Sequence, residues 1–104
     1  MSSAFEYFNL FLNNFDSVRN EKEVKIYFSK KKYPYLKTIF SDHGVLVRLN
    51  KNTYFGLWVV NRMRKKMLLS LNDTKIYLYV RDWFVTCEDD NLIITLKRPQ
   101  VITS

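Results

Sequence analysis

The chain has 104 residues, 47% of them hydrophobic and 16% aromatic, and its formal net charge is +7. This length fits one domain with a core, and the basic excess favours an anionic partner, with nucleic acid first and an anionic membrane surface second. The single cysteine excludes an intramolecular disulfide and the paired cysteines of a zinc site. No apolar run approaches the roughly 20 residues of a membrane-spanning helix, so we expect no membrane partner.

The chain begins with a pattern typical of an amphipathic helix over roughly residues 3 to 15. Ser3 and Glu6 have the spacing of a capping box, in which each side chain satisfies a free amide of the first turn. Large apolar residues then recur at steps of three and four, namely Phe5, Phe8, Leu12 and Phe15. Residues 16 to 23 are polar and predict a connecting loop.

A strand and a second helix are predicted next. Val24 to Phe28 alternates apolar and polar residues as a half-covered strand does. Pro34 suits the first turn of a helix that starts near Lys32, and Gly44 suits the position just past its end. This helix would place Leu36, Ile39 and Phe40 on one face. We expect Gly44 to have a positive φ, and we expect His43 to cap the last carbonyls.

The rest of the chain predicts strands that are separated by turns. Their ranges are Val45 to Leu49, Tyr54 to Val60, Met67 to Leu71, Lys75 to Val80, Arg81 to Cys87 and Leu92 to Lys97. In the run from Lys75, Ile76, Leu78 and Val80 share one face, while Tyr77 and Tyr79 share the other. Cys87 ends an apolar run, so we expect a buried structural thiol.

The order of these elements resembles the N-terminal half of the universal small-subunit ribosomal protein eight family. The matching residues are Glu6, Tyr7, Phe8, Phe11 and Asn13 in the first helix, then Ser29, Lys31, Leu36, Ile39, Phe40, Gly44, Val45 and Leu46. Further on they are Leu92 to Lys97, with Val101 and Ile102. The resemblance implies an α+β fold, in which two helices pack on a small mixed sheet in helix-strand-helix-strand-strand order. Residues 1 to 104 would form a single domain, with a core of 1 to 49 and 91 to 104 and a β-rich insertion at about 50 to 90.

The resemblance also implies a structural constituent of the small ribosomal subunit that binds ribosomal RNA. Its partners would be that RNA and neighbouring small-subunit proteins. Either this half works alone, or a separate chain supplies the family's missing C-terminal half. Many Phe, Tyr, Lys, Asn and Ile residues have AT-rich codons, which points to an organelle ribosome, in the mitochondrion before the plastid. The alternative is a small viral or plasmid-encoded protein–protein interaction module without RNA.

Two basic clusters are the candidate RNA contacts. The first is the turn from Ser29 to Lys32, where a hydroxyl, ammonium groups and helix-start amides suit phosphate oxygens. The second contains Arg62, Arg64, Lys65 and Lys66. Tyr33 and Tyr35 stand beside the first cluster, either to stack on unpaired bases or to pack in the core. The resemblance adds Asn13, and the two-sided apolar pattern that ends near Trp83 and Phe84 makes these two residues candidate anchors for a neighbouring protein.

No pattern indicates an enzyme. The chain lacks glycine-rich phosphate loops and the nucleophile motif of hydrolases. His43 is the only histidine, so a catalytic or metal site based on paired histidines is excluded. The acidic turn from Glu88 to Asp90 is read as solvated. We therefore expect no catalytic residues, no metal and no cofactor.

Overall fold

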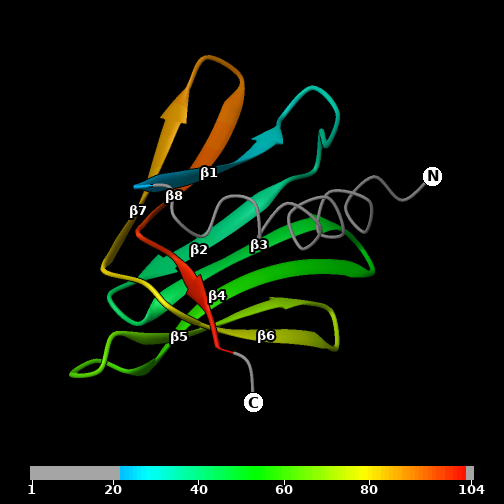
Figure 1. The fold of residues 1–104 in the computed structure, drawn as a ribbon. Coiled ribbons are helices and arrows are strands. Elements are labelled where there is room, and N and C mark those ends of the chain that lie inside the picture. Colours follow the sequence, from blue (N-terminus) through cyan, green and yellow to red (C-terminus); the bar gives the residue numbers. More distant parts are fainter. Residues whose placement is uncertain (1–21, 103–104) are drawn as a thin grey trace.

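The computed structural model describes residues 22 to 102, and within them it is an all-β protein with two antiparallel sheets. Figure 1 shows the smaller sheet lying across one face of the larger sheet. The strands are β1 (Glu23–Ser29), β2 (Lys37–Ser41), β3 (Gly44–Asn50), β4 (Thr53–Asn61), β5 (Lys66–Leu71), β6 (Thr74–Tyr79), β7 (Asp82–Glu88), β8 (Asn91–Lys97) and β9 (Gln100–Val101). The predicted first helix and Asn13 lie outside the described residues.

The larger sheet has six strands in the order β2-β3-β4-β5-β6-β9. Strands β2 to β6 follow one another as hairpins, because short turns separate their alternating runs. Asn72, in the β5–β6 turn, has φ 53°, and Lys65, in the β4–β5 turn, has φ 58°. These left-handed residues allow the chain to reverse within a few positions.

The smaller sheet has the order β1-β8-β7 and shares a long bent hairpin with the larger one. Strands β6 and β9 pair in the large sheet, and their continuations β7 and β8 pair in the small sheet. One bend follows Val80, and the other lies at Arg98, which has φ 49°, and the buried Pro99. The hydrogen bond from Arg81 N to Lys97 O (2.9 Å) holds the two bends together. Corners of this kind let one strand pair serve two sheets.

The core lies between the sheets and consists of inward-facing aliphatic and aromatic side chains. The small sheet contributes Ile26, Phe28, Leu92, Ile94 and Leu96, and the large sheet contributes Val45, Val47, Leu49, Phe55, Leu57, Met67, Leu69, Leu71 and Leu78. Phe28 meets Phe55 edge to face across the interface, with 5.0 Å between ring centroids. This geometry suits the ring quadrupoles, so it fixes the sheets together as well as burying apolar area.

The expected α+β fold with two helices is wrong. Residues 22 to 102 contain no helix, and the segment predicted as the second helix forms a turn and then β2. Tyr33 is buried, and it anchors the turn through hydrogen bonds from Tyr33 N to Ser29 O (3.0 Å) and from Leu36 N to Tyr33 O (3.1 Å). Ile39 and Phe40 then lie on opposite faces of a strand, because they pair with Leu46 and Val45.

The signals that indicated a helix end have another cause. Gly44 does have a positive φ of 155°, but it is the residue where the β2–β3 hairpin re-enters its strand. His43 lies in that two-residue turn, so it caps no helix, and Pro34 lies in the turn before β2. Cys87 is exposed, which corrects the expected buried thiol, because it stands near the end of the edge strand β7. The strands predicted from residue 45 onward, and the one at 24 to 28, are confirmed.

Candidate nucleic-acid interface

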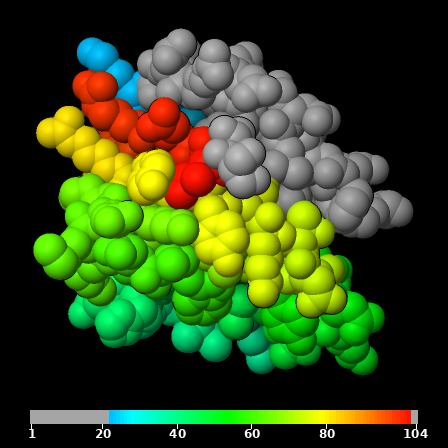
Figure 2. All heavy atoms as spheres, turned by 60° about the horizontal axis from the view of Figure 1, so that its bottom comes forward, coloured from blue at the N-terminus to red at the C-terminus, as the bar shows by residue number. Residues whose placement is uncertain are grey.

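The outer face of the six-stranded sheet carries an unusual set of side chains. Strand alternation directs alternate residues of each strand away from the core, and the pairing registers bring these residues into rows. We call this the outer face, and it consists of Lys37, Ile39, Leu46, Arg48, Tyr54, Gly56, Trp58, Lys66, Leu68, Ser70, Lys75, Tyr77 and Tyr79. Figure 2 shows the strands of this sheet in succession, from yellow β6 to the green and teal strands below it.

Charge on this sheet has one sign. Strands β2 to β6 contain no aspartate or glutamate, and the acids Asp42 and Asp73 lie in turns. Strand residues of the smaller sheet include Glu23, Asp82 and Glu88, so acidic groups are segregated to the other layer. A surface with cations and no carboxylates attracts a polyanion without local competition.

Trp58 lies flat against the sheet because both glycines of the chain make room for it. A Cβ at Gly56 would stand 2.5 Å from the indole Nε1, and a Cβ at Gly44 would stand 2.7 Å from Cε3. Any larger residue at either position would collide with the ring. The indole is half-buried, so one side rests on backbone while part of it faces solvent. This is the geometry of a stacking platform for a planar ligand.

Tyrosines and cations surround this platform. Tyr54, Tyr77 and Tyr79 are each about 40% exposed. The guanidinium carbon of Arg48 lies 5.6 Å from the ring centre of Tyr54, and Lys66 Nζ lies 5.1 Å from that of Tyr77. These cation–π contacts orient the side chains while leaving their charge at the surface.

A pocket extends the outer face at its β2–β3 end. It has a volume of about 460 Å³, and its lining residues are Tyr35, Lys37, Arg48, Asn50 and Lys51. The ring of Tyr35 is 81% exposed. Arg48 is held there by hydrogen bonds from Nε to Asn50 O and from a terminal nitrogen to Lys51 O, both 3.4 Å. The pocket therefore combines an open aromatic ring with three cationic side chains.

The first predicted cluster does not belong to this face. The backbone amide of Lys30 donates to Asp90 O at 2.7 Å, and Lys31 Nζ lies 3.5 Å from an Asp90 carboxylate oxygen. The hydroxyl of Ser29 accepts a hydrogen bond from Lys32 N at 3.3 Å. The acidic β7–β8 turn therefore neutralises part of this cluster. Tyr33 is only 8% exposed, so its ring is unavailable for stacking.

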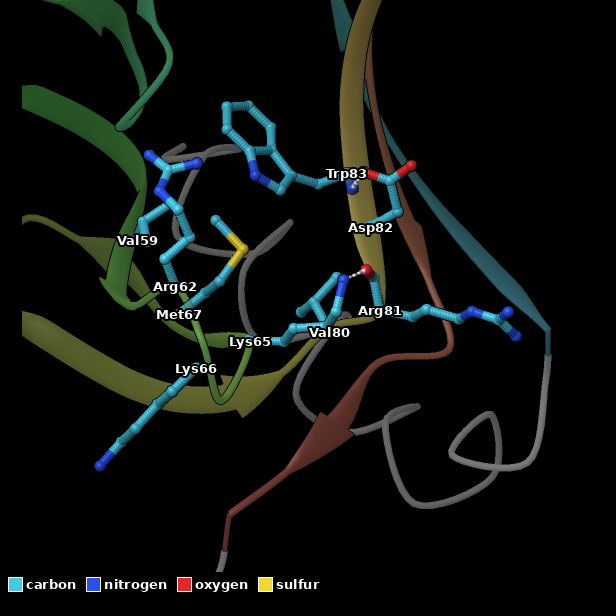
Figure 3. Close-up of a pocket in the computed structure, with 9 residues that line it drawn as sticks. All are labelled: Val59, Arg62, Lys65, Lys66, Met67, Val80, Arg81, Asp82 and Trp83. Carbon is cyan, nitrogen blue, oxygen red and sulfur yellow. Dashed lines mark hydrogen bonds between the residues drawn. The ribbon is translucent and has the colours of Figure 1, made fainter.

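The second predicted cluster divides between two surfaces. Lys66 belongs to the outer face. Arg62 instead donates to Asp42 O (3.2 Å) and approaches His43 Nδ1 (3.5 Å), while Lys65 Nζ donates to Arg81 O (3.0 Å). Figure 3 shows these side chains around a cavity of about 130 Å³, with Lys66 directed away from it. Arg64 is exposed in the turn itself.

The two clusters lie at opposite ends of β7, a strand of seven residues that spans roughly 20 Å at about 3.3 Å per residue. The structure therefore does not bring them together as one surface. The candidate protein anchors lie between them. Trp83 is half-buried and meets Phe40 edge to face at 5.8 Å, whereas Phe84 is 41% exposed on the outside of the small sheet. Their contact with a neighbouring protein stays a prediction.

An ion-pair group on the small sheet lowers the pKa of Glu23. The hydrogen bond from Lys97 holds the pKa of Glu23 below its ordinary value, and the charges of Lys97 and Lys25 act in the same direction. Lys97 Nζ also lies 5.7 Å from the ring centre of Phe84. These side chains lie on the outside of the small sheet, where they link β1 to β8.

No three His, Cys, Asp or Glu residues between positions 22 and 102 are grouped to hold a metal ion. The described part of the chain has no helix with the length and apolarity of a membrane span. Comparison of the chain with protein-family models, curated proteins and solved structures gave no match.

Sequence reasoning missed the outer face as a site. It put Tyr77 and Tyr79 on one strand face, but the sequence alone does not show the strand registers that bring these rings beside Tyr54 and Trp58. The missing signal is the absence of acidic residues from four consecutive predicted strands, Val45 to Leu49, Tyr54 to Val60, Met67 to Leu71 and Lys75 to Val80, whose outward positions include aromatic and basic residues.

Proposed function

We propose that this protein binds single-stranded nucleic acid, with RNA as the first candidate, on the outer face of its six-stranded sheet. The observation that supports this proposal best is Trp58, which two glycines hold flat on an acid-free surface. Unpaired bases offer a planar face of matching size, whereas duplex bases are already stacked. The binding is non-catalytic.

The mechanism combines stacking with charge neutralisation. Bases stack on Trp58 and on neighbouring tyrosines, each contributing about 1–3 kcal/mol in proteins of this type. Arg48, Lys66 and Lys75 meet phosphates along the strand. Lysines act as point charges that position the backbone, so the proposal expects weak sequence preference.

The ribosomal role and the organelle location stay predictions. The basis of the ribosomal role was the resemblance, and that of the organelle location was the AT-rich codon usage. Residues 32 to 43, which carried the second helix of the resemblance, form a turn and β2. RNA binding no longer depends on that resemblance, because the outer face supports it from a different set of residues. An assembly role in a ribosome would be tested by cosedimentation with small subunits.

The first experiment measures binding of a fluorescent oligouridine to the full chain by anisotropy. Trp58→Ala should weaken binding about 5- to 150-fold, the equivalent of one lost stack. Trp83→Phe is the matched control, because this second tryptophan faces β2 and the edge of the core. The variant should bind oligouridine with the same affinity as wild type. Equal affinity of wild type and Trp58→Ala would refute the proposal, provided that circular dichroism shows both folded.

The second experiment separates the outer face from the first predicted cluster. Changing Lys66 and Lys75 to alanine should lower the slope of log affinity against log salt by about 1.4, at roughly 0.7 per phosphate on a single strand. The same double change at Lys30 and Lys31 should leave the slope almost unaltered. The opposite pattern would move the site to the Ser29 to Lys32 turn. Oligodeoxythymidine and a duplex, tested in parallel, distinguish RNA preference, general single-strand binding and duplex binding.

A further inference from the structure

Strand β2 is an open edge of the large sheet that keeps apolar side chains on both faces. All five of its residues are exposed. Ile39, on the outer face, is 67% exposed, and Phe40, on the inner side, is 59% exposed. The strand has no proline and no bulge, and its one charged residue is Lys37 at the end. Edge strands without such protection are templates for pairing with another strand.

The backbone groups available for pairing follow from the hairpin. The two-residue turn closes on the pair Ser41–Gly44, so alternation directs the hydrogen bonds of Ile39 and Lys37 toward β3. The N–H and C=O groups of Thr38 and Phe40 therefore point away from the sheet. These two residues are symmetric about Ile39.

We propose that two copies of this chain pair antiparallel through β2, on a two-fold axis at Ile39, to form a continuous sheet. Thr38 of each copy then exchanges both backbone hydrogen bonds with Phe40 of the other. Ile39 meets its own counterpart across the axis, and Lys37 faces Ser41 of the second copy, so no like charges are opposed. A self-complementary contact of this kind closes as a dimer and cannot extend into a fibre.

The other edges of the described sheets fit a second copy less well. Self-pairing of β7 about Val85 would oppose Asp82 and Glu88, two carboxylates on an exposed strand. Strand β9 has only two residues. Along β1 the apolar residues Ile26 and Phe28 are already buried, so pairing there would cover little additional apolar surface. Among the edges of the described sheets, β2 combines free backbone groups and uncovered apolar side chains without opposing like charges.

This dimer does not require nucleic acid, and it stands independently of the proposed function. A two-fold axis perpendicular to the sheet would, however, place both outer faces on the same side. The pocket beside Tyr35 would then flank the dimer axis in each copy, and the acid-free surface would double in length. The expected affinity is weak, because one strand pair buries less area than a standard interface.

The test is sedimentation equilibrium of the full chain without nucleic acid, over micromolar to millimolar concentrations. Wild type should show a reversible monomer–dimer equilibrium. Ile39→Lys places two ammonium groups across the axis and should shift the dissociation constant at least tenfold toward monomer, while thermal unfolding stays close to wild type because residue 39 is exposed. Met63→Lys adds the same charge at a 95% exposed site in the β4–β5 turn and should leave the equilibrium unchanged.

A charge-swap experiment identifies the contact. Ile39→Glu alone should also be monomeric, and a mixture of Ile39→Glu with Ile39→Lys should restore a heterodimer. A monomeric wild type at millimolar concentration would overturn the proposal. So would a dimer that Ile39→Lys does not weaken, or a mixture that fails to associate. Binding of an unrelated extended peptide to β2 by a monomeric wild type would assign the edge to a different partner.

Discussion

Replacing Gly44 with alanine should be among the most destabilising single changes in this protein. The added Cβ would stand 2.3 Å from the carbonyl oxygen of Leu57 and 3.0 Å from the Cα of Trp58. Both are backbone atoms of the central strand β4, so they cannot rotate away as a side chain would. The residue also has φ 155°, which a side chain disfavours.

The two effects can be combined from typical values. Strain at such a backbone position costs about 1–3 kcal/mol, and forced overpacking costs a further 1–3 kcal/mol. We therefore expect a loss of about 3 kcal/mol, which for a domain of this size lowers the melting temperature by about 12–24 °C. This exceeds the roughly 1 kcal/mol that the loss of a left-handed glycine alone would cost.

The assay is urea unfolding followed by tryptophan fluorescence, with thermal unfolding by circular dichroism as a second probe. Ser41→Ala is the matched control, because its hydroxyl accepts one exposed hydrogen bond from His43 N at 3.2 Å. That change should cost less than about 1 kcal/mol. A Gly44→Ala protein within 0.5 kcal/mol of wild type would refute the close approach of residue 44 to β4.

Three further outcomes are expected. Lys97 lowers the pKa of Glu23, so the ionised Glu23 stabilises the fold fully above the ordinary pKa of 4.5, and this stabilisation disappears as pH falls through the lowered pKa. Glu23→Gln should therefore make the free energy of unfolding depend less on pH in this acid range. Above pH 4.5 the variant's curve should run parallel to that of wild type. A steeper acid limb in the variant would contradict the ion pair. Phe28→Ala should cost about 3–5 kcal/mol in urea unfolding, because it opens a cavity against Phe55 at the sheet interface, and a loss below 1 kcal/mol would place that ring outside the core. Cys87 should react with a thiol reagent in the native state at nearly the rate of the unfolded chain, since it is exposed, whereas protection until unfolding would show that it is covered.

Strand positions were predictable from this sequence because alternation is a local property. Tyr77 and Tyr79 face one way and Leu78 the other, as their spacing indicates. The segment from Lys32 to His43 failed because Leu36, Ile39 and Phe40 fit both a helical face and a turn followed by a strand. Pairing with β3 favours the turn and strand over the helix. The five residues of β2 do not by themselves reveal that pairing. Gly44 is compatible both with the position just past a helix end and with a hairpin.

In the candidate site, too, the residue types were visible in the sequence, but their neighbours in space were not. Each cation and aromatic ring of the outer face was visible in the sequence, but its neighbours are set by the registers of successive strands, which pair outer-face residues up to 14 positions apart. Clusters that are contiguous in sequence attracted attention instead. The turn from Ser29 to Lys32 then proved to lie against Asp90, which is distant in sequence. Contiguous charge is therefore a weaker guide to a binding surface than the sign of charge across a whole sheet.

Within residues 22 to 102, strand β1 pairs only with β8, and Glu23 and Lys97 are 74 positions apart. Hairpins β2 to β6 join neighbours in sequence and can form as soon as each turn closes, but β1 must wait for a long loop to close. During synthesis at about 5–20 residues per second, β1 would leave the ribosome about 4–15 s before its partner. For that interval Ile26 and Phe28 have no sheet to join. Complete burial of Ile26 and Phe28 in the newly made chain therefore depends on the late strand β8.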